Sequence, residues 1–157
     1  MSIEQGRAYL TQRGYGDRIL EFSVSSATVE LAAQAVGCEG AHIAKTLSFG
    51  VGEGCVLIVC AGDAKIDNSK FKQFFHCKAT MLTPEQVEAF TGHAVGGVCP
   101  FGIQREDVTT YLDMSLQRFE TVYPAAGNAA SAVRLSCEEL YTLSTAAGWI
   151  DVCKNWA

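Results

Sequence analysis

The sequence of 157 residues has only three prolines, and it lacks any hydrophobic run long enough to cross a membrane. A bilayer-spanning helix needs about 20 consecutive apolar residues, and the first ten residues also lack the apolar stretch of a signal peptide. Positive charge is scarce, because 12 Lys and Arg face 17 Asp and Glu, a net charge of −5 that argues against broad non-specific nucleic-acid binding. We therefore expect a single globular domain over residues 1–157, in the cytoplasm and without membrane contact.

Several motifs of known chemistry are also missing. The seven cysteines form no CxxC pair, and Cys38 and His42 would need a second ligand pair that the sequence does not offer, so we expect neither a metal nor a cofactor. The cysteines are predicted to be reduced and mostly buried. GxGxxG, P-loop, HExxH and GxSxG motifs are absent, and the three histidines have no carboxylate partner at an obvious spacing. Any hydrolysis would therefore depend on positioning and main-chain donors.

Helical and strand patterns interleave along the chain without a strict βαβ rhythm. Apolar residues make up 48%, and CVLIVCAG (residues 55–62) has the continuous apolar character of a strand buried on both faces. The expected helices cover residues 3–13 and 66–75, a further helix runs from a cap at Ser25, Ser26 or Thr28 to Gly37, and others begin at Pro84 and Ser136. The expected strands cover 18–23, 42–50, 55–62, 77–82, 108–113, 119–123 and 131–135, with a last short strand or turn at 149–150. Short connections between strands favour an α+β fold, with a twisted mixed sheet of roughly six to seven strands flanked by helices.

Lys45 has an unusual position in HIAKTLSFG (residues 42–50). Strand alternation places Lys45 on the same face as Ile43, Leu47 and Phe49. A lysine among apolar side chains loses hydration unless its ammonium reaches water or meets an anion. Two interpretations are open: a lysine that extends to solvent, or a cation that serves a phosphate or a polarised carbonyl.

The stretch AVGGVCPFG (residues 94–102) joins a permissive backbone to a rigid one. Gly96 and Gly97 allow positive φ and close approach of a ligand, and Pro100 restricts the backbone conformation where the chain leaves the loop. Main-chain N–H groups in such a loop can bind an anion or oxyanion, although a simple turn explains the same residues. Cys99 lies inside this loop, but no base is evident beside it, so we do not expect a nucleophile there.

Four segments taken together resemble the YbaK-like family of aminoacyl-tRNA editing proteins, which are related to the domain inserted in bacterial prolyl-tRNA synthetases. The segments are AHIAKTLSF, VLIVCAGDAKID, FTGHAVGGVCPFG and TVYPAAGNAASAVRLSCEEL. Their order and spacing agree over nearly the whole chain, and the pairing of a strand-borne KTL with a downstream GGxxP is the specific feature. The resemblance implies a compact mixed-sheet domain of the YbaK type, and it implies hydrolysis of the ester bond of mischarged aminoacyl-tRNA.

By this resemblance, Lys45 stands where the family's lysine engages the terminal adenosine end of the substrate. Gly96, Gly97, Val98, Cys99 and Pro100 stand at its GxxxP loop, whose main chain holds the aminoacyl carbonyl. Water, the substrate's 2′-hydroxyl or, in the cysteine-specific branch, the substrate thiol performs the attack.

Further substrate-binding residues are expected at the late glycine of the family, here Gly127, and at Asn128 after it. The cysteine-specific branch carries a basic residue after that glycine and an acidic residue entering the next strand. This chain has Asn128 and Ala132 there, which argues against cysteine specificity.

Other polar residues allow two interpretations each. Ser25, Ser26 and Thr28 either line the amino-acid pocket opposite Lys45 or only cap the following helix. Residues 64–78 carry a local charge of +3, which is either a solvated helix face or a contact for tRNA. Asp113, at a strand end, is either a site residue or a structural one.

The sequence thus predicts a free-standing trans-editing aminoacyl-tRNA deacylase that positions its substrate with Lys45 and the 96–100 loop. The expected partner is the acceptor end of aminoacyl-tRNA, with a synthetase as a further candidate; the oligomeric state is not indicated. A binding module for such an acceptor end or for a synthetase, without catalysis, is the alternative, and a hydrolase of small esters is the third hypothesis.

Overall fold

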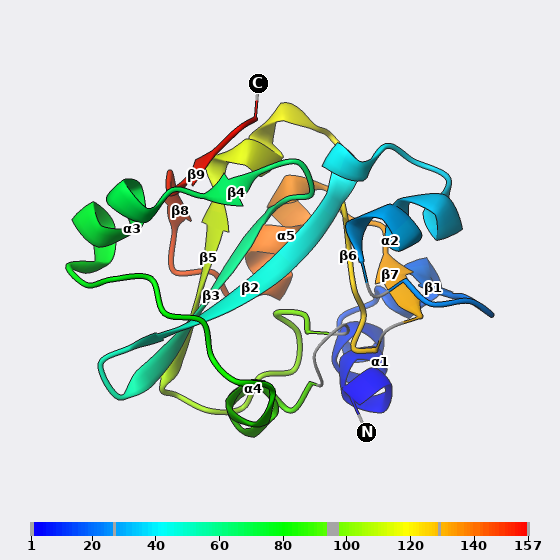
Figure 1. Cartoon of the computed structure of the whole chain (residues 1–157). Coiled ribbons are helices and arrows are strands. Elements are labelled where there is room, and N and C mark those ends of the chain that lie inside the picture. The colour runs from blue at the N-terminus through cyan, green and yellow to red at the C-terminus, as the bar shows by residue number, and fades with distance from the viewer. Residues whose placement is uncertain (1, 27, 94–97, 129, 157) are drawn as a thin grey trace.

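A long hairpin of β2 (Ile43–Val51) and β3 (Gly54–Ala61) lies at the centre of the fold (Figure 1). The computed structural model describes residues 2–26, 28–93, 98–128 and 130–156. The hairpin is antiparallel, and β6 (Tyr123–Pro124), β5 (Val108–Asp113) and β8 (Trp149–Ile150) extend it through parallel pairs. The resulting mixed sheet has the order β6-β2-β3-β5-β8, with β3 buried over nearly its whole length, as predicted.

Two further ladders of two strands each lie outside this sheet. One pairs β1 (Ile19–Glu21) with β7 (Ser131–Val133), and the other pairs β4 (Lys65–Ile66) with β9 (Cys153–Lys154). The mixed α+β architecture is confirmed. Within the described residues, however, the central sheet has five strands, because part of the predicted strand set forms these separate ladders.

Local sequence signals account for the helix boundaries. The helices are α1 (Ser2–Gln12), α2 (Val29–Val36), α3 (Asn68–Phe75), α4 (Pro84–Thr91) and α5 (Cys137–Leu143), with short 3₁₀ turns η1 (Gly16–Arg18), η2 (Gly40–His42) and η3 (Met114–Arg118). Thr28 caps α2, which ends at Gly37 in the left-handed conformation, and capping boxes begin α4 at Thr83 and α5 at Ser136. Within the described residues, none of these helices has the length and apolar character needed to cross a membrane.

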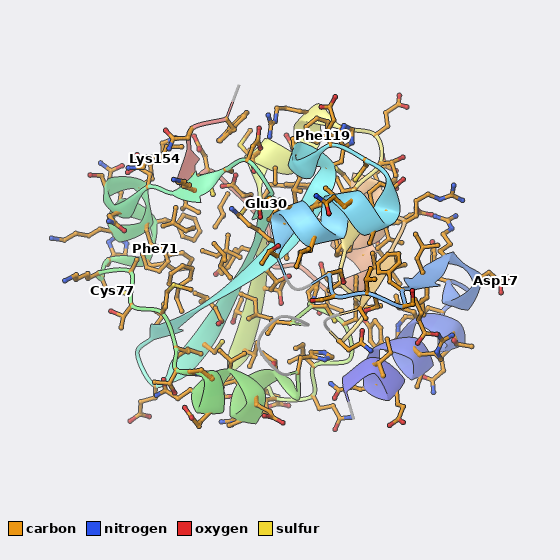
Figure 2. All side chains as sticks on the ribbon, turned by 45° about the vertical axis from the view of Figure 1, so that its right-hand side comes forward. Asp17, Glu30, Phe71, Cys77, Phe119 and Lys154 are labelled. Atoms are coloured by element: carbon orange, nitrogen blue, oxygen red, sulfur yellow. The ribbon has the colours of Figure 1, made fainter. Side chains whose placement is uncertain are left out.

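The core is formed between the sheet and the helices around it. Phe71 of α3 is fully buried, and its ring lies 5.0 Å from that of Phe49 on β2 (Figure 2). All seven cysteines are free thiols, and four of them are buried: Cys55, Cys60, Cys99 and Cys153. No group of three or more potential metal ligands occurs among the described residues. The cysteines thus mostly behave as small core side chains.

Two strand predictions were wrong in extent. Residues 77–82 form no strand, and only Met81 makes an isolated bridge to Phe49 at the edge of β2. The strand predicted over 119–123 is reduced to β6, because η3 runs to Arg118 and Pro124 has no N–H to continue the pairing with β2.

Candidate functional site

Lys45 lies near the start of β2, where it pairs with Cys60 of β3. Its Nζ donates to the Ala64 carbonyl at 2.5 Å and to the Gly62 carbonyl at 3.3 Å, in the turn that follows β3. A lysine ammonium has three N–H donors, so these bonds leave one for a ligand. Among the described residues, no carboxylate forms an ion pair with Lys45. The ammonium is therefore oriented by main-chain dipoles, and its charge is not neutralised.

Asp63 lies in this turn, between Gly62 and Ala64, and its carboxylate has a different partner. Arg118 donates to both of its carboxylate oxygens, at 2.6 and 3.0 Å. The Asp63 pKa is lowered chiefly by this hydrogen bond, with a smaller contribution from the charge of Lys45. Arg118 thus engages the carboxylate that would otherwise compete for Lys45.

A cavity of about 420 Å³ opens beside Lys45. It is bounded by β2, the start of α2, residues 81–87, Val98, β6 and β7. Serine and threonine hydroxyls and apolar side chains make up most of the wall, and Lys45 is the one charged residue among the described residues that line it. A second cavity of about 430 Å³ lies between η3, α5 and β8, but it contains none of the predicted site residues. The arrangement suits a ligand that presents an anionic or polarised oxygen to Lys45 and is uncharged over the rest of its surface.

Three further predicted residues share this cavity, namely Ser26, Thr28 and Val98. Thr28 accepts a hydrogen bond from the Leu31 N–H at 3.1 Å, so it caps α2 and faces the cavity at once. Ser26 is buried and accepts from the Ser131 N–H at 3.1 Å, which links the start of α2 to β7. Ser25 is exposed and does not line the cavity.

The glycine loop is described only in part. Gly96 and Gly97 lie outside the described residues, so their predicted role stays a prediction. Cys99 and Pro100 are both buried, and neither lines the Lys45 cavity; Pro100 borders a separate cavity beside Tyr9 and Arg105. Of the described loop residues, Val98 is therefore the one that contacts the candidate site.

Cys99 has a histidine beside it, which corrects the sequence interpretation. Its Sγ lies 3.5 Å from His93 Nε2, and both residues are fully buried. That nitrogen also lies 2.9 Å from the Phe101 carbonyl, which can only accept, so Nε2 carries the hydrogen and cannot take a proton from the thiol. Burial raises the pKa of Cys99 to about 12 and lowers that of His93. Cys99 is therefore a buried thiol that His93 does not activate as a thiolate.

Replacement of Cys99 with alanine is therefore expected to leave the rate constant for ester hydrolysis within about threefold of the unmodified protein. The loss of a buried sulfur should lower the free energy of unfolding by about 1 kcal/mol. Single-turnover hydrolysis and denaturant unfolding measure the two effects. A fall in rate of a hundredfold without loss of folded protein would instead identify Cys99 as a nucleophile.

Gly127 is buried and Asn128 is half-buried, and neither residue lines the cavity. Asn128 Oδ1 accepts from the Ala130 N–H at 3.0 Å, and its carbonyl accepts from Ser131 Oγ at 3.3 Å. Gly127 has φ of 129°, a conformation that favours glycine. Both residues shape the turn before β7, and their predicted contact with substrate stays a prediction. Ala132, by contrast, lines the cavity where the cysteine-specific branch carries an acid.

Residues that the sequence did not single out complete the wall, among them Thr46, Ser48, Met81, Tyr123 and Ser131. Strand alternation puts Thr46 and Ser48 on the face opposite Lys45. They share a cavity with it because the cavity lies at an open edge of β2, where both faces meet. The sequence KTLS shows that these hydroxyls are close to Lys45 along the chain. The open edge of β2 that brings them into the same cavity depends on tertiary packing.

Comparison with known proteins gives consistent results. The family model described as "Aminoacyl-tRNA editing domain" matches residues 24–143. "Uncharacterized protein YwhH" of Bacillus subtilis (strain 168) is 51% identical over 157 residues, covering 99% of both chains. "Putative Cys-tRNA(Pro)/Cys-tRNA(Cys) deacylase EbsC" of Enterococcus faecalis (strain ATCC 700802 / V583) is 29% identical over 132 residues, covering 83% of this chain and 80% of that protein.

A solved structure described as "Crystal structure of a putative trans-editing enzyme for prolyl tRNA synthetase" superposes with a TM-score of 0.87. It is 31% identical in sequence, and the match covers 97% of this chain and 96% of that one. Similarity to this structure therefore extends over nearly the whole fold.

Proposed function

Because this chain belongs to the aminoacyl-tRNA editing domain family, we propose that it is a trans-editing deacylase that hydrolyses the ester bond of mischarged aminoacyl-tRNA. The observation that carries the proposal is the Lys45 ammonium, which has a donor to spare and is the only charged group among the described residues of the cavity wall. The names of the Enterococcus relative and of the solved structure support the same reaction class. The seven free cysteines fit a reducing compartment, and we place the activity in the cytoplasm.

In this reaction Lys45 donates to an oxygen of the terminal nucleotide and holds the ester next to the 96–100 loop, of which Val98 lines the cavity. The main chain of Gly96 and Gly97 receives the carbonyl oxygen as negative charge develops on it. Water adds to the carbonyl carbon and gives up a proton, and the ribose oxygen leaves and takes up a proton, so that the free amino acid and the tRNA hydroxyl are formed. If the substrate's own 2′-hydroxyl adds first, the acyl group moves to the 2′ oxygen, and water then hydrolyses this second ester in the same way. No Asp, Glu, His or Cys is among the described residues that line the cavity, so catalysis rests on positioning and on main-chain donors.

The cavity also restricts the amino acid that is removed. Lys45 disfavours cationic side chains, and the described wall offers no carboxylate to receive them. Ala132 puts a methyl group where the cysteine-specific branch carries an acid. We propose that the substrate carries a small uncharged amino acid other than cysteine, although the Enterococcus relative is named for Cys-tRNA.

A panel of aminoacyl-tRNAs tests the proposal. The purified chain should deacylate one or a few mischarged species, with the matching correctly charged tRNAs left intact. Binding of charged tRNA without turnover on every species would favour the alternative, a binding module for the acceptor end or for a synthetase. Hydrolysis of small esters that uncharged tRNA does not inhibit would favour the third hypothesis.

One edge of the molecule offers a contact for the phosphates of the tRNA. Apart from Lys45, the sequence has five lysines, and all of them lie in residues 65–78 or at Lys154. Lys65 and Lys154 are exposed and directly opposite each other in the β4–β9 ladder, where like charges repel. Figure 2 shows Lys154 on the same side as α3 and Cys77. The chain leads from the turn that holds Lys45 directly into β4, so this edge continues the site.

Charge reversal at both positions, Lys65→Glu with Lys154→Glu, is expected to raise KM for aminoacyl-tRNA at least about tenfold and leave kcat unchanged. The slope of log KM against log salt concentration should fall by about two, one for each lost phosphate contact. Arg13→Glu with Arg134→Glu changes the net charge equally at a distant site and serves as the control. The same KM in both double variants would contradict a specific contact.

A further inference from the structure

The edge of β2 has a gap in its hydrogen bonding. β6 pairs with β2 only at Ile43 and Ala44. At the other end, the Gly50 N–H donates to the Thr80 carbonyl at 3.0 Å, and the Leu82 N–H donates to the Ser48 carbonyl at 3.3 Å. Between these two contacts lies Thr46, which pairs with Val59 of β3 on one side and has no strand beside it on the other side within the described residues.

The main chain of Thr46 points into this gap. In an antiparallel pair, successive residues direct their N–H and C=O groups to alternate sides of the strand. Ser48 and Gly50 direct theirs away from β3, so Thr46 does the same. Its side-chain Oγ1 is buried and lacks a hydrogen-bond partner among the described residues. Within the described residues, the three polar groups of Thr46 therefore have no partner, and a buried polar group without a partner is costly.

The gap opens into the cavity that holds Lys45, and its two borders differ. Tyr123 and Ala125 stand on the β6 side, and Met81 and Leu82 stand on the other. Tyr123 is the one aromatic residue among the described residues of the wall. Met81 is 62% exposed, which places this part of the cavity at its mouth. A flat group that enters here can stack on the Tyr123 ring with its edge toward Thr46.

We infer that the Thr46 main chain binds the Watson–Crick edge of an adenine base. The N–H and C=O of one residue in an extended strand lie side by side and take a neighbouring acceptor and donor. Adenine presents this pair, because N1 accepts and the N6 amino group donates. This assignment rests on the proposed function: the base belongs to the terminal adenosine of the aminoacyl-tRNA, with its ribose directed to Lys45.

Nucleotide competition tests the inference without requiring turnover. AMP and IMP differ on this edge, because hypoxanthine has a donor at N1 and an acceptor at O6. In IMP the N1–H would face the Thr46 N–H, and O6 would face the Thr46 carbonyl oxygen. We expect AMP to bind, and to inhibit deacylation, about tenfold or more tightly than IMP. Equal affinity for the two nucleotides, or binding of neither, would overturn the inference.

Two variants at one position separate the main chain from the side chain. Thr46→Pro removes the N–H at an unpaired edge, where proline is tolerated, and should abolish the preference for AMP. Thr46→Val keeps the main chain and the shape and should retain the preference. If the proline variant does not fold, the AMP and IMP comparison on the unmodified protein still decides. Adenine preference without hydrolysis of any charged tRNA would support the inference and reject the proposed function; hydrolysis without adenine preference would do the reverse.

Discussion

Replacement of Lys45 with alanine is expected to lower the rate of aminoacyl-tRNA deacylation by about 100-fold or more. The ammonium is the one charged group in the described cavity wall and holds the terminal nucleotide that carries the ester, and a small misplacement of a reacting group can cost about 100-fold in rate. Lys45→Met, which keeps most of the length without the charge, should be as inactive as Lys45→Ala. Hydrolysis under single-turnover conditions is the measurement, because it separates chemistry from tRNA release.

The controls for Lys45 address folding and charge. The turn at residues 61–64 keeps the bond from the Ala64 N–H to the Ala61 carbonyl at 3.0 Å without the lysine, so the variants should stay folded in thermal unfolding. Arg134→Ala removes an exposed cation elsewhere and should retain the full rate. Unchanged hydrolysis of every substrate by a folded Lys45→Ala protein would remove Lys45 from the proposed mechanism.

Replacement of Asp113 with alanine is expected to reduce the free energy of unfolding by about 4 kcal/mol. Asp113 is fully buried at the end of β5, and each carboxylate oxygen accepts one main-chain N–H at 2.9 Å, from Ser115 and from Val152. These bonds join β5 and η3 to the chain between β8 and β9. Alanine would leave two buried N–H groups without partners, and each charge-assisted bond of this kind contributes about 2 kcal/mol.

Matched variants make the Asp113 prediction specific. Asp113→Asn keeps one accepting oxygen and should lose about half as much stability, whereas Asp17→Ala, at an exposed turn, should change it by less than about 0.5 kcal/mol. Denaturant unfolding of the three variants measures these differences. A loss below about 1 kcal/mol for Asp113→Ala would contradict the structural role. Of the two sequence interpretations of Asp113, the structural one is favoured, since this residue does not line the Lys45 cavity.

Local chemistry was readable along the chain wherever it depends on near neighbours. Thr28 with Gly37, Thr83 with Pro84, and Ser136 with Glu139 marked the helix ends, because capping involves groups within one turn. The apolar run at 55–62 marked β3, because a strand covered on both faces needs apolar side chains throughout. The resemblance to editing domains was likewise carried by KTL and GGxxP, which are short and fixed in order.

Contacts between distant segments could not be read in this way. Residues 77–82 have the composition of a strand, yet a strand needs a partner along its length, and β2 offers them one only near Met81. His93 and Cys99 are six residues apart, and only the fold of the intervening loop brings the ring to the thiol. Pairings of this kind depend on the path of the whole chain.

The sequence by itself determined the family, the order of the main elements and the choice of Lys45, because each rests on short motifs or on periodicity. Only the tertiary structure decided what surrounds Lys45. The carbonyls that orient its ammonium come from a turn after β3, and the cavity exists because β6 and residues 81–82 meet β2 at separate points and leave Thr46 uncovered. Such a gap is a property of how three distant segments pack, and no local pattern in any one of them encodes it.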